Sequence, residues 1–255
     1  FYDGQWRTVV LCGLGYGGNS YFALDITDPT SPQHLFTFEN DIVNERVYYW
    51  DAAGNKSRYR YDANSPGTFQ DPAMSDGSGD ADDPDAGGED RLDLGDPPAG
   101  GGGSGTIGPN DPLISTAPEY DFRKLGKALS KPNILRIKVD GLDKWVAVFG
   151  GGYNQLDAGV ASSVFVIDME DGGKILSQID LEDVNDAGLE TNLVKNSVPA
   201  QLIPITADGT SLATYYGALV YFADYEGKLW KLNLSSNGDL YEAHTLFDSG
   251  ATPDN

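Results

Sequence analysis

The sequence is poor in cysteine, histidine and long apolar runs, and each shortage excludes a class of function. Its one cysteine, Cys12, lies inside an apolar run, so the chain can form no internal disulfide. With only His34 and His244 beside it, the chain cannot supply a His/Cys zinc site of recognisable spacing. No serine stands between a strand and a helix, as a nucleophile elbow requires. We therefore expect no enzyme.

Apolar runs of transmembrane length and a signal peptide are also absent. The sequence begins at Phe1, a few residues before a predicted strand, so we expect a fragment of a longer protein whose targeting signal lies outside it. Basic residues number 17 against 39 acidic ones, and the formal charge of -22 would repel nucleic acid and anionic membranes. Cations or basic protein surfaces are the expected partners, unless the acidic surface serves only solubility.

A strand–turn–strand pattern occurs three times. The best copy, at 144–176, has apolar runs at 145–149 and 164–169 on either side of three glycines, and the other copies begin near Arg7 and Ala218. The second strands share an aromatic residue, an aliphatic residue two positions later and then Asp or Asn: Phe22, Leu24, Asp25; Phe165, Ile167, Asp168; Trp230, Leu232, Asn233. Residues two apart lie on one face of a strand, and repeated units that cannot bury that face alone are typical of a propeller or solenoid.

This repetition predicts an all-β fold, a β-propeller interrupted by a long irregular insertion. The predicted blades are 1–40, 131–183 and 184–255, and the insertion is 41–130. Ninety residues that break the rhythm are too many for an ordinary connection, so we expect function to reside there.

The insertion begins with a predicted β-hairpin of 46–50 and 57–61 around a Gly-Asn turn. Its aromatic residues suggest a contact surface, and the alternative is an aromatic face packed on the neighbouring domain. They are Tyr48, Tyr49, Trp50, Tyr59 and Tyr61. Near its end, apolar residues at helical spacing predict one short helix over 121–129.

The middle of the insertion is acidic, with ten acidic residues and one basic residue between 71 and 96. Asp76, Ser78, Asp80 and Asp82 place oxygens at alternate positions, as a calcium loop does. The order of an EF-hand is not met, because Ala81 stands in place of the glycine and Gly87 in place of the late glutamate. Calcium binding is one interpretation of this segment, and a solvated acidic loop is the other.

The segment 13–18 matches the spacing G-x-G-x-x-G of dinucleotide sites. A Rossmann site needs a helix to begin there, and 20–26 instead predicts a second strand. The equivalent glycines at 150–152 have the same setting, so these glycines indicate turns.

Six motifs occur in an order that resembles a known family. They are QWRTVV at 5–10, GLGYGG at 13–18, YFALDITDP at 21–29, SKP at 130–132, WVAVFGGGYN at 145–154 and YFADYEGKLWK at 221–231. Together they resemble the carboxy-terminal β-propeller of the PilC/PilY proteins of bacterial type IV pili, over about 1–40 and 130–235. The resemblance implies about three blades of a modified seven-bladed propeller.

The resemblance further implies a secreted protein at the pilus tip or outer surface of a bacterium, associated with the outer membrane. Such proteins promote pilus assembly with minor pilins and adhere to host-cell or surface receptors. The family's calcium loop, D-x-[DN]-x-D-G-x-x-D, is matched only by Asp208 and Gly209, so calcium at that position is not carried over. The Arg-Gly-Asp sequence of some members is absent.

Two alternatives remain. The segment 165–175 is similar to the repeat of quinoprotein dehydrogenases, which use pyrroloquinoline quinone, but the threonine and tryptophan of that repeat are missing. This departure favours a propeller without catalysis. The other alternative is a periplasmic scaffold on a similar propeller.

Overall fold

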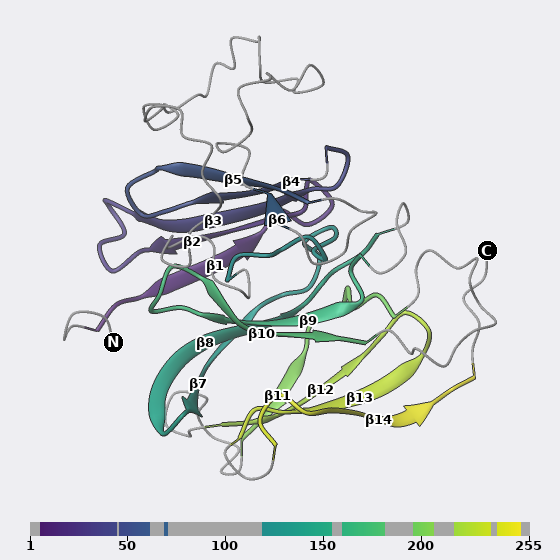
Figure 1. Cartoon of the computed structure of the whole chain (residues 1–255). Coiled ribbons are helices and arrows are strands. Elements are labelled where there is room, and N and C mark those ends of the chain that lie inside the picture. The colour runs from purple at the N-terminus through teal and green to yellow at the C-terminus, as the bar shows by residue number, and fades with distance from the viewer. Residues whose placement is uncertain are drawn as a thin grey trace.

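The computed structural model describes residues 6–44, 46–61, 69–70, 119–154, 160–181, 196–206, 217–235 and 239–250, with 58–61 and 69–70 as backbone only. These residues form an all-β structure of three antiparallel sheets (Figure 1). Within them no α-helix occurs, and no helix could therefore cross a membrane.

The three sheets follow one another along the chain. The first has the order β1 (Val9–Gly13), β2 (Ser20–Asp25), β3 (Gln33–Asp41), β4 (Arg46–Trp50), β5 (Lys56–Tyr61) and β6 (Phe69–Gln70). The second contains β7 (Asn133–Val139), β8 (Leu142–Gly150), β9 (Ser163–Asp168) and β10 (Lys174–Asp180). The third contains β11 (Ile203–Ile205), β12 (Leu219–Ala223), β13 (Lys228–Asn233) and β14 (Ala243–Asp248).

The three copies seen in the sequence are equivalent in register. Asp25 lies opposite Val9, Asp168 opposite Val146, and Asn233 opposite Leu219. Strands β7 and β11 precede the copies in the second and third sheets, whereas in the described part of the first sheet no strand pairs with the other edge of β1. That sheet is extended at its opposite edge, where the predicted hairpin, β4 and β5, joins β3.

Two cores hold the sheets face to face in chain order (Figure 1). The first core lies between the first two sheets, where the ring of Phe38 stacks on Phe122 with centroids 3.7 Å apart. The second core lies between the second and third sheets and includes Val148, Val166 and Leu232, all fully buried. The middle sheet therefore buries both of its faces, which explains the continuous apolar run of β9.

The helix predicted at 121–129 is wrong. Phe122 and Leu125 are fully buried, as the spacing implied, but Lys127 and Ala128 form isolated β-bridges with Tyr153 and Gly15. The backbone N–H groups of Gly126, Lys127 and Ala128 therefore bond to neighbouring loops rather than to a preceding helical turn. The segment 119–130 lies between the first two sheets, so both ends of the predicted insertion are parts of the fold.

The residue that ends each second strand is a buried Asp or Asn that caps the following turn. The side chains of Asp25, Asp168 and Asn233 each accept the backbone N–H two residues later, at 2.8, 2.9 and 3.0 Å. In the first two sheets a positively charged side chain also binds the carboxylate, Arg7 at 2.7 Å and Lys144 at 2.5 Å. Each of these residues lies two positions before the residue that pairs with the aspartate, Val9 or Val146. The third sheet has Asn233 and, at the cation's position, Gly217.

The cap at Asp25 predicts a specific loss of stability in acid. Hydrogen bonds from the hydroxyl and N–H of Thr27, and then Arg7, lower the pKa of Asp25 from 3.8 to about 2. The folded state therefore binds fewer protons, so this stabilisation is complete above pH 3.8 and is lost as pH falls through about 2. Urea unfolding of the protein and of Asp25→Asn should show a difference in unfolding free energy that shrinks across this window. A constant difference would contradict the assignment.

Candidate interaction surfaces

The predicted aromatic hairpin divides its side chains between two faces of the first sheet, because successive residues of a strand point to opposite sides. Tyr49 points into the core between the first two sheets. Its hydroxyl donates to the carbonyl oxygen of Gly172 at 2.8 Å, and its ring centroid lies 4.2 Å from that of Tyr120. Burial, and then the neighbouring Tyr120, raise the pKa of Tyr49, so its hydroxyl remains a donor at all ordinary pH values.

The opposite face of the hairpin carries Tyr48 and Trp50, whose ring centroids are 5.9 Å apart. The ammonium of Lys56 lies 4.4 Å from the centre of the Tyr48 ring and 5.5 Å from that of Trp50. This is a cation–π arrangement, in which the attraction between ammonium and ring is stronger where water is partly excluded. Glu39 lies opposite Tyr48, and burial and then Asp41 raise its pKa. Tyr48 is 8% exposed, and Trp50 is partly exposed.

The five aromatic residues of the predicted contact surface therefore lie in different environments. Tyr49 takes part in the core, as the alternative of a packed aromatic face describes. Tyr48 and Trp50 lie on the outer face with Lys56. Tyr59 and Tyr61 are placed in β5, and their side chains lie outside the described part. The role of this face in binding stays a prediction, and it now rests on Trp50 and its neighbours.

We expect Tyr49→Phe to lower the free energy of unfolding by about 0.5–1.5 kcal/mol, the usual net value of one hydrogen bond. The variant keeps the ring against Tyr120 and loses the hydroxyl that donates to Gly172 across the two sheets. Urea unfolding measures the change. Tyr16→Phe is the matched control, because Tyr16 is 75% exposed and its change should have no effect. Equal effects at the two positions would contradict the bond's role.

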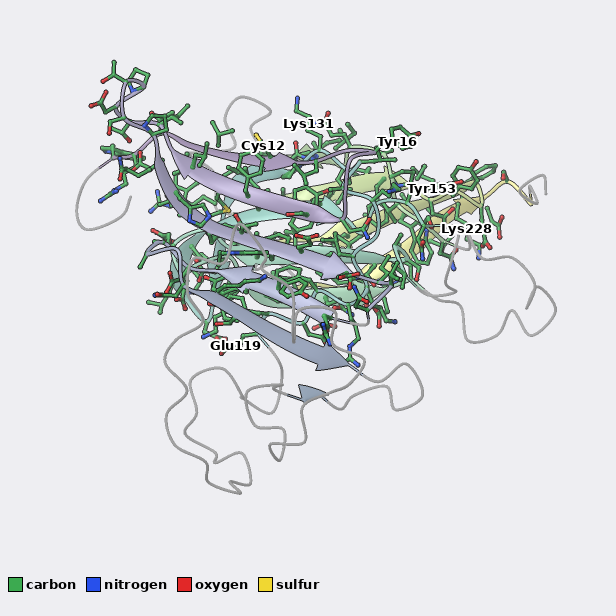
Figure 2. All side chains as sticks on the ribbon, turned by 90° about the horizontal axis from the view of Figure 1, so that it is seen from above. Cys12, Tyr16, Glu119, Lys131, Tyr153 and Lys228 are labelled. Atoms are coloured by element: carbon green, nitrogen blue, oxygen red, sulfur yellow. The ribbon has the colours of Figure 1, made fainter. Side chains whose placement is uncertain are left out.

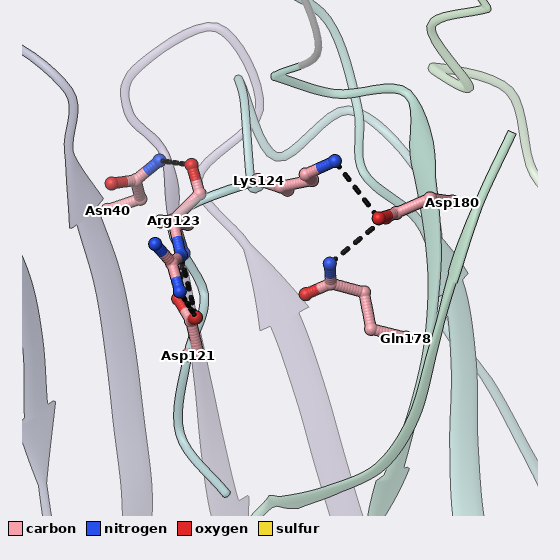
Figure 3. Close-up of polar contacts among 6 residues, drawn as sticks. All are labelled: Asn40, Asp121, Arg123, Lys124, Gln178 and Asp180. Carbon is pink, nitrogen blue, oxygen red and sulfur yellow. Dashed lines mark hydrogen bonds and ion pairs between the residues drawn. The ribbon is translucent and has the colours of Figure 1, made fainter. Parts of the chain in front are cut away.

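A polar cluster closes the junction between the first two sheets (Figure 3). The amide of Asn40, at the end of β3, donates to the carbonyl oxygens of Arg123 and Leu125, both at 2.7 Å. Asn40 is 1% exposed, so these bonds are shielded from water. They fix the segment 119–130 to the first sheet.

The charged groups of this cluster pair with one another. Arg123 binds Asp121 through Nε at 2.7 Å, and Lys124 binds Asp180 at 3.0 Å (Figure 3). Burial raises the pKa of Asp121 although Arg123 opposes the shift. At Asp180 burial is outweighed by hydrogen bonds and by the charge of Lys124, and its pKa is lowered. Because each of these charges has a partner within the cluster, the cluster joins the first two sheets.

The calcium ligands predicted from the sequence, Asp76, Ser78, Asp80 and Asp82, lie outside the described residues. Elsewhere, in the part of the chain that the structure does describe, no group of three or more His, Cys, Asp or Glu side chains could hold a metal ion. Calcium binding at 76–82 stays a prediction.

Sequence reasoning missed a row of tyrosines on the loops that join the first and second strands of each copy. Tyr16 and Tyr153 follow the glycines at 13–15 and 150–152, and Tyr225 lies in the corresponding turn of the third sheet. Figure 2 shows Tyr16 and Tyr153 at the same border of the molecule, with Lys131 further along it. The repeated Gly-Tyr sequence contained this signal, which was interpreted only as a turn.

No protein-family model matches the chain. It is 24% identical over 237 residues to the type IV pilus biogenesis factor PilY1 homolog of Xylella fastidiosa, across 92% of this chain and 10% of that protein. It is 38% identical over 48 residues to the type IV pilus biogenesis factor PilY1 of Pseudomonas aeruginosa, across 19% of this chain and 4% of that protein. The chain thus spans a tenth or less of the length of these relatives.

Among solved structures, the crystal structure of the Pseudomonas aeruginosa PilY1 C-terminal domain is similar, with a TM-score of 0.44 and 18% identity over 92% of this chain and 28% of that chain. The sequence relatives confirm the family resemblance inferred from the six motifs.

Proposed function

We propose, on the premise that this chain is a relative of the PilY1 type IV pilus biogenesis factors, that it is a non-enzymatic module which supports pilus assembly and adhesion. The match across 92% of the chain to a pilus biogenesis factor homolog carries this proposal. The whole protein would act at the bacterial cell surface, at the pilus tip or the outer membrane. Its partners would be minor pilins and a receptor on a host cell or another surface.

The three sheets would be blades of a β-propeller. Each is an antiparallel meander. The loops of the first two sheets contact the chain that enters the next sheet: the N–H of Gly15 donates to the carbonyl of Ala128, and that of Gly152 to the carbonyl of Val198. The outer face of the third sheet also supports this fold, because it exposes apolar side chains that a further blade would cover. These residues are Ile203, Ile205, Leu219, Leu229 and Phe247, each 37–61% exposed.

The contact surface of the proposed module would be the outer face of the hairpin, with Trp50 and Lys56 at its centre. In the bacterium that encodes the protein, we expect deletion of residues 1–255 from the full-length protein to reduce surface pili and adhesion to host cells. Full-length protein carrying Trp50→Ser should retain its amount but lose adhesion. Val43→Ser is the matched control, because Val43 is 83% exposed in the turn before the hairpin. Unchanged piliation and adhesion after the deletion would refute the proposal.

Calcium and the absence of catalysis belong to the same proposal. Calcium would bind Asp76, Ser78, Asp80 and Asp82, and isothermal titration of the chain at millimolar calcium tests this. No heat of binding, or equal heat in Asp80→Asn with Asp82→Asn, would remove the ion from the proposal. Turnover of alcohols after addition of pyrroloquinoline quinone and calcium would instead establish the dehydrogenase alternative.

A further inference from the structure

The three sheets present their tyrosine-bearing loops at one end of the stack. Tyr16 is 75% exposed, Tyr225 is 48% exposed, and Tyr153 is partly exposed between them. An exposed aromatic ring contributes less burial to the fold than a core ring does, and tyrosine is enriched where proteins bind one another. We call this end, defined by Tyr16, Tyr153, Tyr225, Lys127 and Lys131, the tyrosine end.

Backbone contacts make the tyrosine end continuous. Gly15, which precedes Tyr16, forms a β-bridge with Ala128, and the next residue back, Lys127, forms a bridge with Tyr153. Two hydrogen bonds of 2.8 and 3.2 Å join Lys127 and Tyr153. The ring of Tyr153 in turn lies 5.7 Å from that of Tyr225. The tyrosines are therefore held by paired backbone, so they are already ordered before a partner binds.

Among the residues that the structure describes, the cations of the tyrosine end have no carboxylate partner. Neither Lys127 nor Lys131 makes an ion pair with any residue that the structure describes, whereas Lys124, Lys138 and Lys144 are all paired. In a chain with a formal charge of -22, unpaired lysines beside exposed tyrosines are a local exception.

The two carboxylates that flank Tyr225 in the sequence are turned into the fold. Asp224 accepts the N–H groups of Glu226 at 3.0 Å and Lys228 at 2.9 Å, and the indole N–H of Trp230 at 2.9 Å. Glu226 is 5% exposed and lies 3.5 Å from the ammonium of Lys228. The side-chain groups that the tyrosine end offers to a partner include the ammoniums of Lys127 and Lys131 and the hydroxyls of Tyr16 and Tyr225.

We propose that the tyrosine end binds an acidic segment of a partner polypeptide. The lysines and tyrosine hydroxyls would donate to its carboxylates, and the rings would cover its apolar atoms. A neutral carbohydrate fits less well, because it brings no negative charge to Lys127 and Lys131, and Asp224 is already hydrogen-bonded within the fold. This surface is separate from the hairpin face, so the inference does not depend on the proposed pilus function.

The test measures fluorescence anisotropy of a labelled peptide of alternating glutamate and serine, added to the purified chain. We expect binding that weakens with added salt and falls about tenfold or more in Tyr16→Ser and in Lys131→Gln. Both side chains are exposed, so neither change should affect folding, and thermal unfolding verifies this.

Matched controls lie at the opposite end of the sheets. Leu142→Ser removes an apolar side chain that is 67% exposed, and Lys138→Gln removes one positive charge. Both should bind the peptide as the unchanged chain does. Equal binding of a peptide with glutamine in place of glutamate would overturn the proposal, as would equal losses in the controls. Binding of dextran or chitin oligosaccharides that Tyr16→Ser abolishes, without peptide binding, would overturn it in favour of a carbohydrate.

Discussion

Replacing Gly152 with alanine is expected to destabilise the chain by about 2–5 kcal/mol. The backbone φ of Gly152 is +89°, a region that costs an L-residue about 1–2 kcal/mol. A Cβ there would also overlap the carbonyl oxygen of Lys127, and such overpacking costs about 1–3 kcal/mol more. Relief requires Lys127 to move away, which breaks its bridge to Tyr153.

Gly141→Ala separates the two causes. Gly141 has a similar φ of +78° in the turn between β7 and β8, and a Cβ there would meet nothing within 4 Å. We expect it to cost only the backbone term of about 1–2 kcal/mol. Urea unfolding of both variants gives the comparison. Equal losses would show that the close approach of Lys127 adds nothing to the cost, and that the segments bridged at Lys127 and Tyr153 can move apart without loss of stability.

The second large effect concerns the pair of Lys144 and Asp168. Asp168 is 1% exposed and its carboxylate lies 2.5 Å from the ammonium of Lys144. Removing the cation leaves a buried charge, so Lys144→Ala should lower the free energy of unfolding by about 3 kcal/mol. Lys138→Ala is the control, because its partner Asp143 is 30% exposed and such pairs contribute about 1 kcal/mol or less.

The third sheet indicates how the loss can be repaired. There Asn233 takes the place of Asp168 and Gly217 the place of Lys144, and the asparagine still caps its turn through Ser235. We therefore expect Lys144→Ala combined with Asp168→Asn to be more stable than Lys144→Ala alone, because no unpaired charge remains. A double-mutant cycle from urea unfolding measures the coupling, expected at about 1–3 kcal/mol. Additive losses would show that the ion pair contributes nothing beyond the separate side chains.

Much of the secondary structure could be predicted from apolar runs and turn residues. Strands β2, β9 and β13 fall where the repeated aromatic and aliphatic pairs predict them, because burial of one face determines that pattern. The alternation of aromatic and polar residues around a turn likewise predicts the hairpin of β4 and β5. Its pairing with β3 was not predicted, because local sequence does not encode which edge a hairpin joins.

The segment 121–129 could not be predicted correctly for a related reason. Phe122 and Leu125 fit a helix and also fit an irregular strand whose partners come from distant loops. Gly126 decides between them: its N–H donates to Gly151, and a Cβ there would meet the carbonyl oxygen of Tyr153 at 2.6 Å. Likewise the partners of Asp25 and Asp168 become visible only once the register is known. The interaction surfaces could not be predicted either, because they depend on which face of the sheet each β4 side chain takes and on contacts between loops of different sheets.

The buried cap has a consequence for how such a chain can change over generations. A charged cap and a neutral cap are both stable, but changing one into the other requires a substitution on each of two strands. Replacing only the lysine leaves a bare carboxylate, and replacing only the aspartate leaves an ammonium without its partner, so each single substitution is expected to destabilise the fold. The two positions are therefore expected to vary together among homologous sheets, with Asp beside Lys or Arg and Asn beside a small residue. Coupled variation of this kind would identify the capping turn in relatives whose remaining sequence has diverged.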